Sequence, residues 1–112
     1  MVNLDPEKAN AIIRSLPYEQ GFHFFSPDGH YTGNTATTLC FFQQILQHID
    51  IESIRFHLYR GDFGKWLNMV IGDHELAEKI GAIDQKTSDW ALREQLVDIV
   101  QKRIVEIKKL IP

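Results

Sequence analysis

The amino-acid sequence predicts one α-rich domain of the α+β class, with about six helices and a short β-hairpin near residues 22–32. Apolar residues recur every three or four positions along most of the chain, which indicates amphipathic helices. One short aromatic segment, Phe22–Phe25, is followed by Ser26-Pro27-Asp28-Gly29, a composition typical of a strand that enters a turn. A length of 112 residues is typical of a single domain with its own core, here residues 1–112.

The first half of the chain predicts a helix, the hairpin and a second helix. Asp5 and Pro6 are typical of a helix start, and this N-terminal helix, within residues 1–17, should end near Ser15 because Pro17 follows. After the hairpin, Thr35 is expected to cap a helix over about residues 36–48. The buried face of that helix is predicted to carry Leu39, Phe42, Ile45, Leu46 and Ile49.

Residues 52–59 fit two structures. Their apolar residues alternate as in a half-buried strand, but Ile54, His57 and Leu58 also share one helical face. We favour a short helix, because Asp50 is a good N-cap and Arg60-Gly61 a good helix end.

Three further helices are predicted in the second half. Asp62 is expected to cap a helix that buries Trp66 and ends at Gly72, and Asp73 to cap a short helix up to about Ile80. Thr87 or Ser88 should then cap a long helix that ends near Leu110, with these residues in its apolar stripe: Trp90, Val97, Val100, Ile104, Ile107 and Ile111.

The composition excludes several classes of protein. A net charge of −3, with basic residues such as Lys102, Arg103, Lys108 and Lys109 gathered only late in the last helix, argues against a nucleic-acid-binding protein. No apolar run reaches the ~18 residues of a membrane span, and the first residues do not resemble a signal peptide. We therefore expect a cytoplasmic protein without a membrane partner. The single cysteine, Cys40, excludes an internal disulfide bond.

His57, Arg60 and Asp62 are the candidate catalytic residues. A histidine base oriented by a carboxylate, with an arginine that binds an anion, would form a small active site. The alternative is structural: Asp62 caps a helix, Gly61 makes the corner, and His57 is buried with a hydrogen bond inside the protein. We favour the structural interpretation. Asp73 and Glu75 are likewise interpreted as ordinary helix-start residues.

The hairpin supplies the candidate ligand-binding residues. Thr32, Gly33, Asn34 and Thr35 would lead into a helix whose free N–H groups could hold an anion, although a P-loop lysine is missing. His23 could face His30 across the hairpin as a weak two-histidine site. The five histidines show no zinc-ligand spacing, so neither a metal nor a cofactor is expected.

Two segments carry a resemblance to a known family. The chain reads FHFFSPDGHYTGNTA early on and SIRFHLYRGDFGKWLNMVIGDHELAEKI later. These segments resemble a family of small prokaryotic domains of unknown function, with a pattern S-I-x-x-H-x-x-R-G-D-F-x-x-W followed by G-D-x-x-L-A, over roughly residues 20–110. The resemblance implies a bacterial or archaeal cytoplasmic protein and no particular activity.

We therefore interpret the chain as a binding or regulatory module for an unknown protein or small molecule. The alternatives are a small enzyme that uses His57 with Arg60 and Asp62, and a dimerisation module. In the last case, Ile104, Ile107 and Ile111 at the end of the last helix would be exposed and covered by a second copy.

Overall fold

The computed structural model describes residues 4–112, which form six α-helices and one two-stranded antiparallel sheet. The predicted α+β class is therefore confirmed. A 3-10 turn precedes the first strand and a π-helical turn continues the fourth helix. In chain order the elements are α1 (Pro6–Ile13), η1 (Tyr18–Gln20), β1 (Phe22–Phe25), β2 (Tyr31–Ala36), α2 (Leu39–Leu46), α3 (Ile51–Arg60), α4 (Asp62–Trp66), η2 (Leu67–Ile71), α5 (His74–Gly81) and α6 (Asp89–Lys108).

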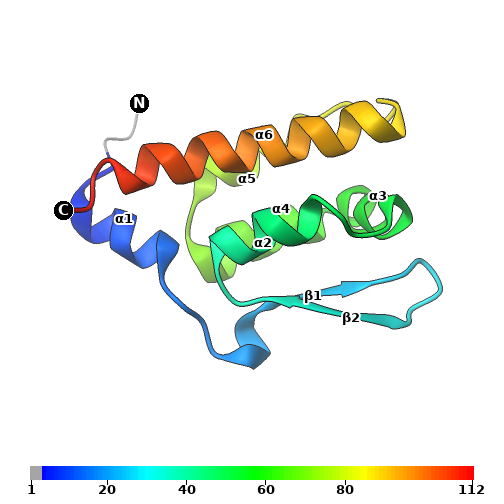
Figure 1. Ribbon diagram of the computed structural model, residues 1–112, viewed down its shortest axis with the longest axis horizontal. Helices are drawn as coiled ribbons and strands as arrows, with labels where there is room; N and C mark the ends of the chain where they lie inside the picture. The colour runs from blue at the N-terminus through cyan, green and yellow to red at the C-terminus, as the bar shows by residue number, and fades with distance from the viewer. Residues whose placement is uncertain (1–3) are drawn as a thin grey trace.

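The elements are arranged in layers around one core. The hairpin lies on one side of the molecule, α6 lies on the opposite side, and α2 and α4 lie between them (Figure 1). α6 packs along α2 and α5 and meets α1 near its C-terminal end. Side chains from the strands and from all six helices contribute to this core, and the largest fully buried ones include Phe24, Phe42, Phe63, Leu39, Leu67, Leu76, Leu92 and Leu96.

The inner face of the hairpin is part of this core. Phe22 and Phe24 alternate with half-buried residues along β1, so they share the face that packs inward. Phe22 contacts Phe63 and Trp66 with ring centroids 5.0 and 5.6 Å apart. Trp66 is buried as predicted, and its indole N–H donates a hydrogen bond to the carbonyl of Gln20 at 2.9 Å. Aromatic packing thus joins the small sheet to the helices.

Local capping explains several helix boundaries. The carboxylate of Asp5 accepts a hydrogen bond from the Lys8 amide at 2.8 Å, and that of Asp50 accepts one from the Glu52 amide at 3.3 Å.

The helix predicted over residues 52–59 is confirmed as α3, and the strand alternative is wrong. α1 ends at Ile13, two residues before the predicted end.

The predicted start of α2 is wrong. Thr35 and Ala36 belong to β2, which extends beyond the predicted second strand. Thr35 pairs with His23 across the hairpin, and Thr38 is the residue that caps α2 by accepting a hydrogen bond from the Phe41 amide at 3.0 Å. The hairpin continues because its inner face, down to Ala36, is covered by the core.

Two arginines donate hydrogen bonds to carbonyl groups at the C-terminal ends of helical segments. Arg14, just beyond α1, donates to the carbonyl of Val70 at 2.6 Å and to that of Ile71 at 3.3 Å, at the end of η2. Arg93 of α6 donates to the carbonyl of Leu46 at 2.8 Å, at the end of α2. These carbonyls have no partner within their own helix, so the arginines satisfy them and join distant segments.

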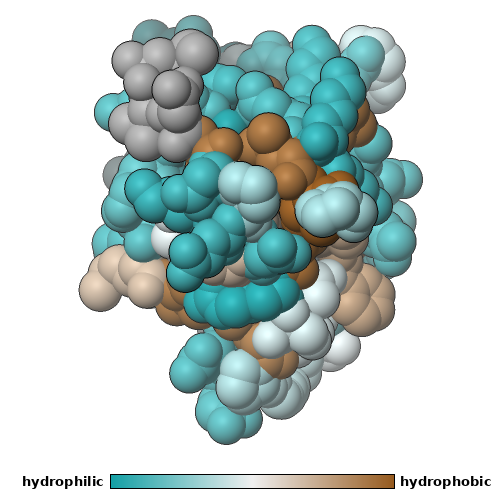
Figure 2. All heavy atoms as spheres, turned by 90° about the vertical axis from the view of Figure 1, so that its left-hand side faces the viewer, coloured by the Kyte–Doolittle hydropathy of each residue, from teal (hydrophilic) through white to brown (hydrophobic). Residues whose placement is uncertain are grey.

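The apolar stripe predicted for α6 faces the core, except at its first residue. Trp90 was expected to be buried but is 76% exposed, whereas Ile104 and Ile107 are buried. The dimerisation alternative required these two isoleucines to be exposed, and their burial contradicts that contact. Figure 2 views the end of the molecule where α1 and the last turns of α6 lie, and hydrophobic atoms show there only in limited areas between hydrophilic ones.

Among residues 4–112, none of the helices is both long enough and apolar enough to cross a membrane.

Candidate functional site

The outer edge of β1 is held by two side chains of α3. The hydroxyl of Ser53 donates a hydrogen bond to the carbonyl of Phe25 at 2.8 Å, and the amide of Phe25 donates one to Nε2 of His57 at 2.8 Å. Ser53 and His57 lie four residues apart, so they are on the same face of the helix. Together they provide hydrogen-bond partners for both the N–H and the C=O group of Phe25, which lies at the strand edge. α3 therefore takes the place of a third strand at this point.

The hydrogen bonds of His57 define its protonation. Since Nε2 accepts a hydrogen bond, the proton of the neutral ring is on Nδ1, which donates to the carboxylate of Asp62 at 2.9 Å. Burial lowers the pKa of His57, and the neighbouring Arg60 lowers it further, whereas the hydrogen bond and charge of Asp62 oppose this shift. The side chain is 4% exposed. His57 is therefore neutral at pH 7 and bonded through both nitrogens.

Asp62 does not cap a helix, so this part of the prediction is wrong. α3 passes directly into α4 through Gly61, whose backbone is left-handed with a φ of +73°. Gly61 occupies the cap position, and Asp62 already lies within α4. Its carboxylate turns toward His57 and toward Nε of Arg60, which lies 3.3 Å away. The predicted corner at Gly61 is confirmed, but Asp62 orients the histidine.

His57, Arg60 and Asp62 are thus brought together, but in an arrangement that supports a structural role. A general base needs a free ring nitrogen that can reach the proton of a substrate. Here the backbone of Phe25 occupies Nε2, and Asp62 occupies Nδ1. Catalysis by His57 would require the strand edge to separate from α3, which argues against the enzyme alternative.

A groove opens beside these three residues, between the outer edge of the hairpin and the end of α3. Its volume is about 420 Å³, and its walls include the half-buried rings of Phe25 and Phe56. The guanidinium of Arg60 lies over the ring of Phe56, 4.9 Å from the centroid, at the rim. The full lining is Gly21, Phe22, His23, Phe25, Gly29, Phe56, His57, Arg60 and Asp62.

A cluster of hydroxyl groups lies next to the groove on the outer face of the hairpin. Nδ1 of His23 is 2.8 Å from the hydroxyl of Thr35, which is also bonded to the hydroxyls of Tyr31 and Tyr18. Hydrogen bonds from Thr35 and Tyr31 lower the pKa of Tyr18. Two of the candidate ligand-binding residues, His23 and Thr35, are therefore in direct contact. Tyr18 and Tyr31, which were not among the candidates, complete the cluster.

The remaining hairpin candidates stabilise the hairpin itself. The hydroxyl of Thr32 donates to the carbonyl of Phe24 across the sheet at 2.7 Å and accepts from the amide of Asn34 at 3.2 Å. Gly33 has a φ of +89°, which favours glycine. Since residues 32–35 lie in β2 and not at a helix start, the helix-start geometry that an anion site would have required is absent there.

The histidines do not form the two-residue site considered above. His30 lies in the turn, where Nδ1 is 2.8 Å from the carboxylate of Asp28, whereas His23 bonds Thr35. Within the part of the chain that the structure describes, no three His, Cys, Asp or Glu side chains are placed to hold a metal ion.

Asp73 has the predicted cap role and a second role that the sequence analysis missed. Its carboxylate accepts a hydrogen bond from the Leu76 amide at 3.1 Å, so the cap is confirmed. The same carboxylate binds Arg103 of α6 through two hydrogen bonds of 2.7 and 2.9 Å. Burial alone would lower the pKa of Arg103, but Asp73, Glu106 and Glu75 outweigh it and raise that pKa.

Arg103, one of the basic residues gathered late in the last helix, is buried. It is 6% exposed and points inward. A signal was present in the sequence: Arg103 is seven residues after Leu96, three after Val100 and four before Ile107, so it shares their buried face.

Comparison with known proteins gives one match. Residues 58–111, fewer than half of the chain, match the model of a family of unknown function, DUF5752. No curated protein and no solved structure shows significant similarity. The matched region starts within α3 and includes Arg60-Gly61-Asp62 and Gly72-Asp73, but not the hairpin. Over this second half, the chain is similar to a family whose description states no activity.

Proposed function

We propose that this protein is a binding module that holds the apolar part of a small molecule or peptide in the groove between the hairpin and α3. The observation that carries the proposal is the combination of two half-buried aromatic rings, Phe25 and Phe56, with a guanidinium at the rim. Ligand sites are usually largely apolar hollows with a few polar groups that orient the ligand. A cytoplasmic, prokaryotic setting is part of this proposal and is supported by the motif resemblance alone.

The charges around the groove favour an anionic ligand group. The carboxylate of Asp62 is directed at His57 and Arg60 and is mostly covered, whereas the side chain of Arg60 is 57% exposed. Nε of this guanidinium lies 3.3 Å from Asp62, and the exposed part of the guanidinium is available to bind a carboxylate or phosphate. We therefore expect an aromatic or aliphatic group that carries a negative charge. Nucleic acid is not part of the proposal, since the net charge is −3.

Three small probes of equal shape and different charge test this proposal. Phenylacetate, phenethylamine and 2-phenylethanol are titrated into isotope-labelled protein while backbone amide resonances are recorded. Phenylacetate should shift the amides of residues 22–25 and 56–62 the most. A fragment of roughly ten heavy atoms is expected to bind with a Kd on the order of 1 mM, at about 0.4 kcal/mol per atom.

Two variants of equal charge separate the groove from the rest of the surface. Arg60→Gln should weaken phenylacetate binding, whereas Lys65→Gln, on the exposed side of α4, removes one positive charge outside the groove and should leave it unchanged. Thermal melting of both variants checks that they remain folded. Chemical-shift changes scattered over the surface would contradict the proposal. Equal affinity for all three probes, or equal binding of phenylacetate by both variants, would contradict it as well.

A further inference from the structure

The hydroxyl cluster on the outer face of the hairpin reaches the groove of the proposed function through His23. This residue lines the groove, and its Nδ1 lies 2.8 Å from the hydroxyl of Thr35. His23 and Phe25 are two residues apart in β1, so they share the outward face of the strand and lie about 7 Å from each other along it. The hairpin therefore contributes an aromatic wall and a histidine to the groove, whereas α3 contributes Arg60.

The hydrogen bonds of this cluster define which nitrogen of the neutral His23 ring carries the proton. The hydroxyl of Thr35 has one hydrogen, which it donates to the hydroxyl of Tyr18 at 3.4 Å. It must therefore accept from its two other partners, the hydroxyl of Tyr31 and Nδ1 of His23. The hydrogen of Tyr31 is then used, so Tyr18 is the donor in the 3.1 Å bond between the two tyrosines. The only arrangement that supplies a hydrogen to every bond has Nδ1 of His23 protonated.

Nε2 of His23 is left as a hydrogen-bond acceptor. Among the described residues 4–112, the hydrogen bonds of this side chain involve Nδ1 alone. Since Thr35 occupies Nδ1, Nε2 is the ring nitrogen that remains for a molecule in the groove. An unprotonated imidazole nitrogen accepts a hydrogen bond from a hydroxyl group but cannot donate one. The groove thus combines an acceptor from the hairpin with a cation from α3.

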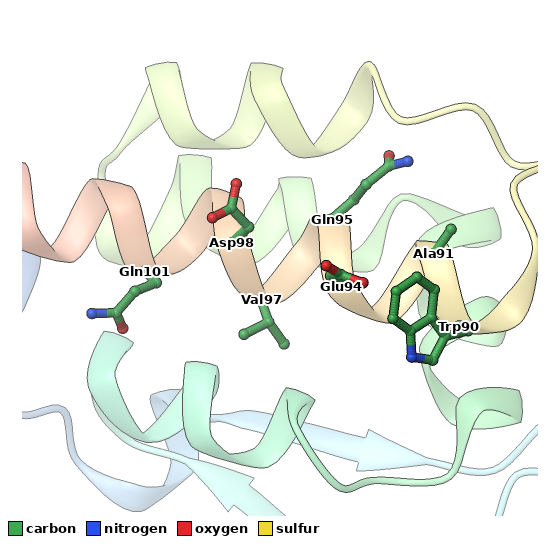
Figure 3. A pocket seen from close by; sticks show the side chains of 7 residues that line it. All are labelled: Trp90, Ala91, Glu94, Gln95, Val97, Asp98 and Gln101. Carbon is green, nitrogen blue, oxygen red and sulfur yellow. The ribbon is translucent and has the colours of Figure 1, made fainter.

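A second groove, along α6, lacks this combination. Figure 3 shows that all seven side chains that line it come from this one helix. They include the carboxylates of Glu94 and Asp98, but no histidine, arginine or lysine. An anionic ligand is therefore not favoured there, and the amides near the exposed Trp90 provide an internal reference for non-specific contact with an aromatic acid.

We infer that the groove between the hairpin and α3 selects small hydroxyaryl acids, and that His23 recognises their hydroxyl group. The aromatic ring of the ligand packs against Phe25 and Phe56, and its acid group binds Arg60. Its hydroxyl donates a hydrogen bond to Nε2 of His23. This inference rests on the proposed function, because it concerns the same groove, and it adds the chemical class of the ligand and the residue that determines specificity.

Acids that differ in one ring substituent test the role of the hydroxyl. Phenylacetate, 4-hydroxyphenylacetate and 4-methoxyphenylacetate are titrated into isotope-labelled protein, and the same three substituents are compared on 4-phenylbutanoate, which spans a longer distance. At one of the two lengths, the hydroxyl acid should bind roughly three- to tenfold more tightly than the other two acids, as expected for one neutral hydrogen bond. The methoxy group is the matched control, because its oxygen can accept a hydrogen bond but cannot donate one.

Two histidine variants locate the acceptor. His23→Phe keeps an aromatic ring in the groove but removes Nε2, so the hydroxyl acid should lose its advantage over the unsubstituted acid. His48→Phe, at an exposed position after α2 and outside the groove, should retain that advantage. Thermal melting confirms that both variants are folded.

The protonation of His23 can be tested without a ligand. Nitrogen-15 chemical shifts of the histidine rings, recorded at about pH 8, distinguish a protonated from an unprotonated ring nitrogen. The wild type should carry the proton of His23 on Nδ1. Thr35→Val removes the acceptor of this proton and should weaken the preference for Nδ1. A wild-type ring that carries its proton on Nε2 would overturn the inference.

Failure of this inference differs from failure of the proposed function. If phenylacetate binds in the groove but the hydroxyl acids bind no more tightly at either length, the selection of hydroxyaryl acids is wrong and the proposed function stands. The same holds if the advantage of the hydroxyl acid persists in His23→Phe. If none of the acids shifts the amides of residues 22–25 and 56–62 more than those near Trp90, both are wrong.

Discussion

At the scale of single residues, His57 is a connector between the hairpin and the helices. It accepts a hydrogen bond from the Phe25 amide and donates one to Asp62, and it lies between the rings of Phe22 and Phe63, with centroids 4.9 and 5.7 Å away. A neutral imidazole is one of few side chains that can accept and donate in this geometry while it packs against aromatic rings.

Removal of the His57 side chain should therefore destabilise the protein strongly. His57→Ala leaves the partly buried Phe25 amide without an acceptor and opens a cavity, and we expect a loss of about 2–4 kcal/mol in the free energy of unfolding. Urea denaturation measures this value. His48→Ala, at an exposed position after α2, serves as the control and should change stability by less than about 0.5 kcal/mol. Equal effects of the two substitutions would contradict the connector role.

The same histidine should make stability depend on pH. Its pKa is lowered in the folded protein, and in the unfolded chain it returns to about 6.5, so the unfolded state binds more protons below that pH. The stabilisation that neutral His57 gives to the folded protein is therefore fully present above pH ~6.5. It is lost as the pH falls through the folded-state pKa of His57. Glutamine can accept from Phe25 and donate to Asp62 but does not titrate. Urea unfolding between about pH 7.5 and about pH 5 should therefore show a flatter profile for His57→Gln than for wild type, and parallel profiles would rule out His57 as the source.

Asp73 is a second residue whose replacement should be costly. Asp73→Ala removes the cap of α5 and also leaves the buried guanidinium of Arg103 without its bidentate partner. We expect a loss of about 3–5 kcal/mol, because an unpaired buried charge is strongly unfavourable. Asp5→Ala removes a cap of the same chemical kind at the exposed start of α1 and should cost about 1 kcal/mol. If calorimetry gives similar losses of stability for the two variants, the ion pair with Arg103 does not contribute to the stability of the protein.

At the scale of secondary-structure elements, the junction between α3 and α4 positions the site. Gly61 alone separates the two helices, so its left-handed backbone sets the angle at which Asp62 returns toward His57. Space does not limit this position, because a Cβ added to Gly61 would meet nothing within 4 Å. Only the backbone conformation requires glycine there.

A pair of glycine substitutions isolates that conformational requirement. Gly61→Ala should cost about 1–2 kcal/mol, since alanine is strained at a φ of +73°. Gly64→Ala, inside α4 where a Cβ also meets nothing, should be neutral or stabilise by up to about 1 kcal/mol. Thermal unfolding measures the stability of both variants. An equal change in stability would mean that the junction tolerates another backbone geometry.

At the scale of the whole molecule, the two tryptophans have opposite roles. Trp66 lies in the core beside Phe22 and Phe42 and bonds the carbonyl of Gln20, whereas Trp90 lies on the surface of α6. Trp66→Ala should lower the free energy of unfolding by about 3–5 kcal/mol, a large share of the stability of a domain. Trp90→Ala, measured at low protein concentration, should cost less than about 1 kcal/mol. Similar losses would mean that Trp90 supports the fold directly.

The sequence by itself was sufficient for features that depend on neighbouring residues. The caps at Asp5, Asp50 and Asp73, the turn of the hairpin and the corner at Gly61 each follow from contacts within a few positions, and all were predicted correctly. The inward position of Trp66 followed from the helical repeat in the same way. Caps, turns and amphipathic faces leave such local patterns because their geometry repeats from protein to protein.

The tertiary structure alone decided which partners the polar residues take. His57 bonds a strand residue 32 positions earlier, Arg103 pairs with an aspartate 30 positions earlier, and Asp62 turns to a histidine rather than to the amides of α4. The exposure of Trp90 likewise depends on which face of α6 meets α1, α2 and α5. These choices arise when distant elements pack, because a buried polar group must then be paired and an apolar stripe can be covered on only one side.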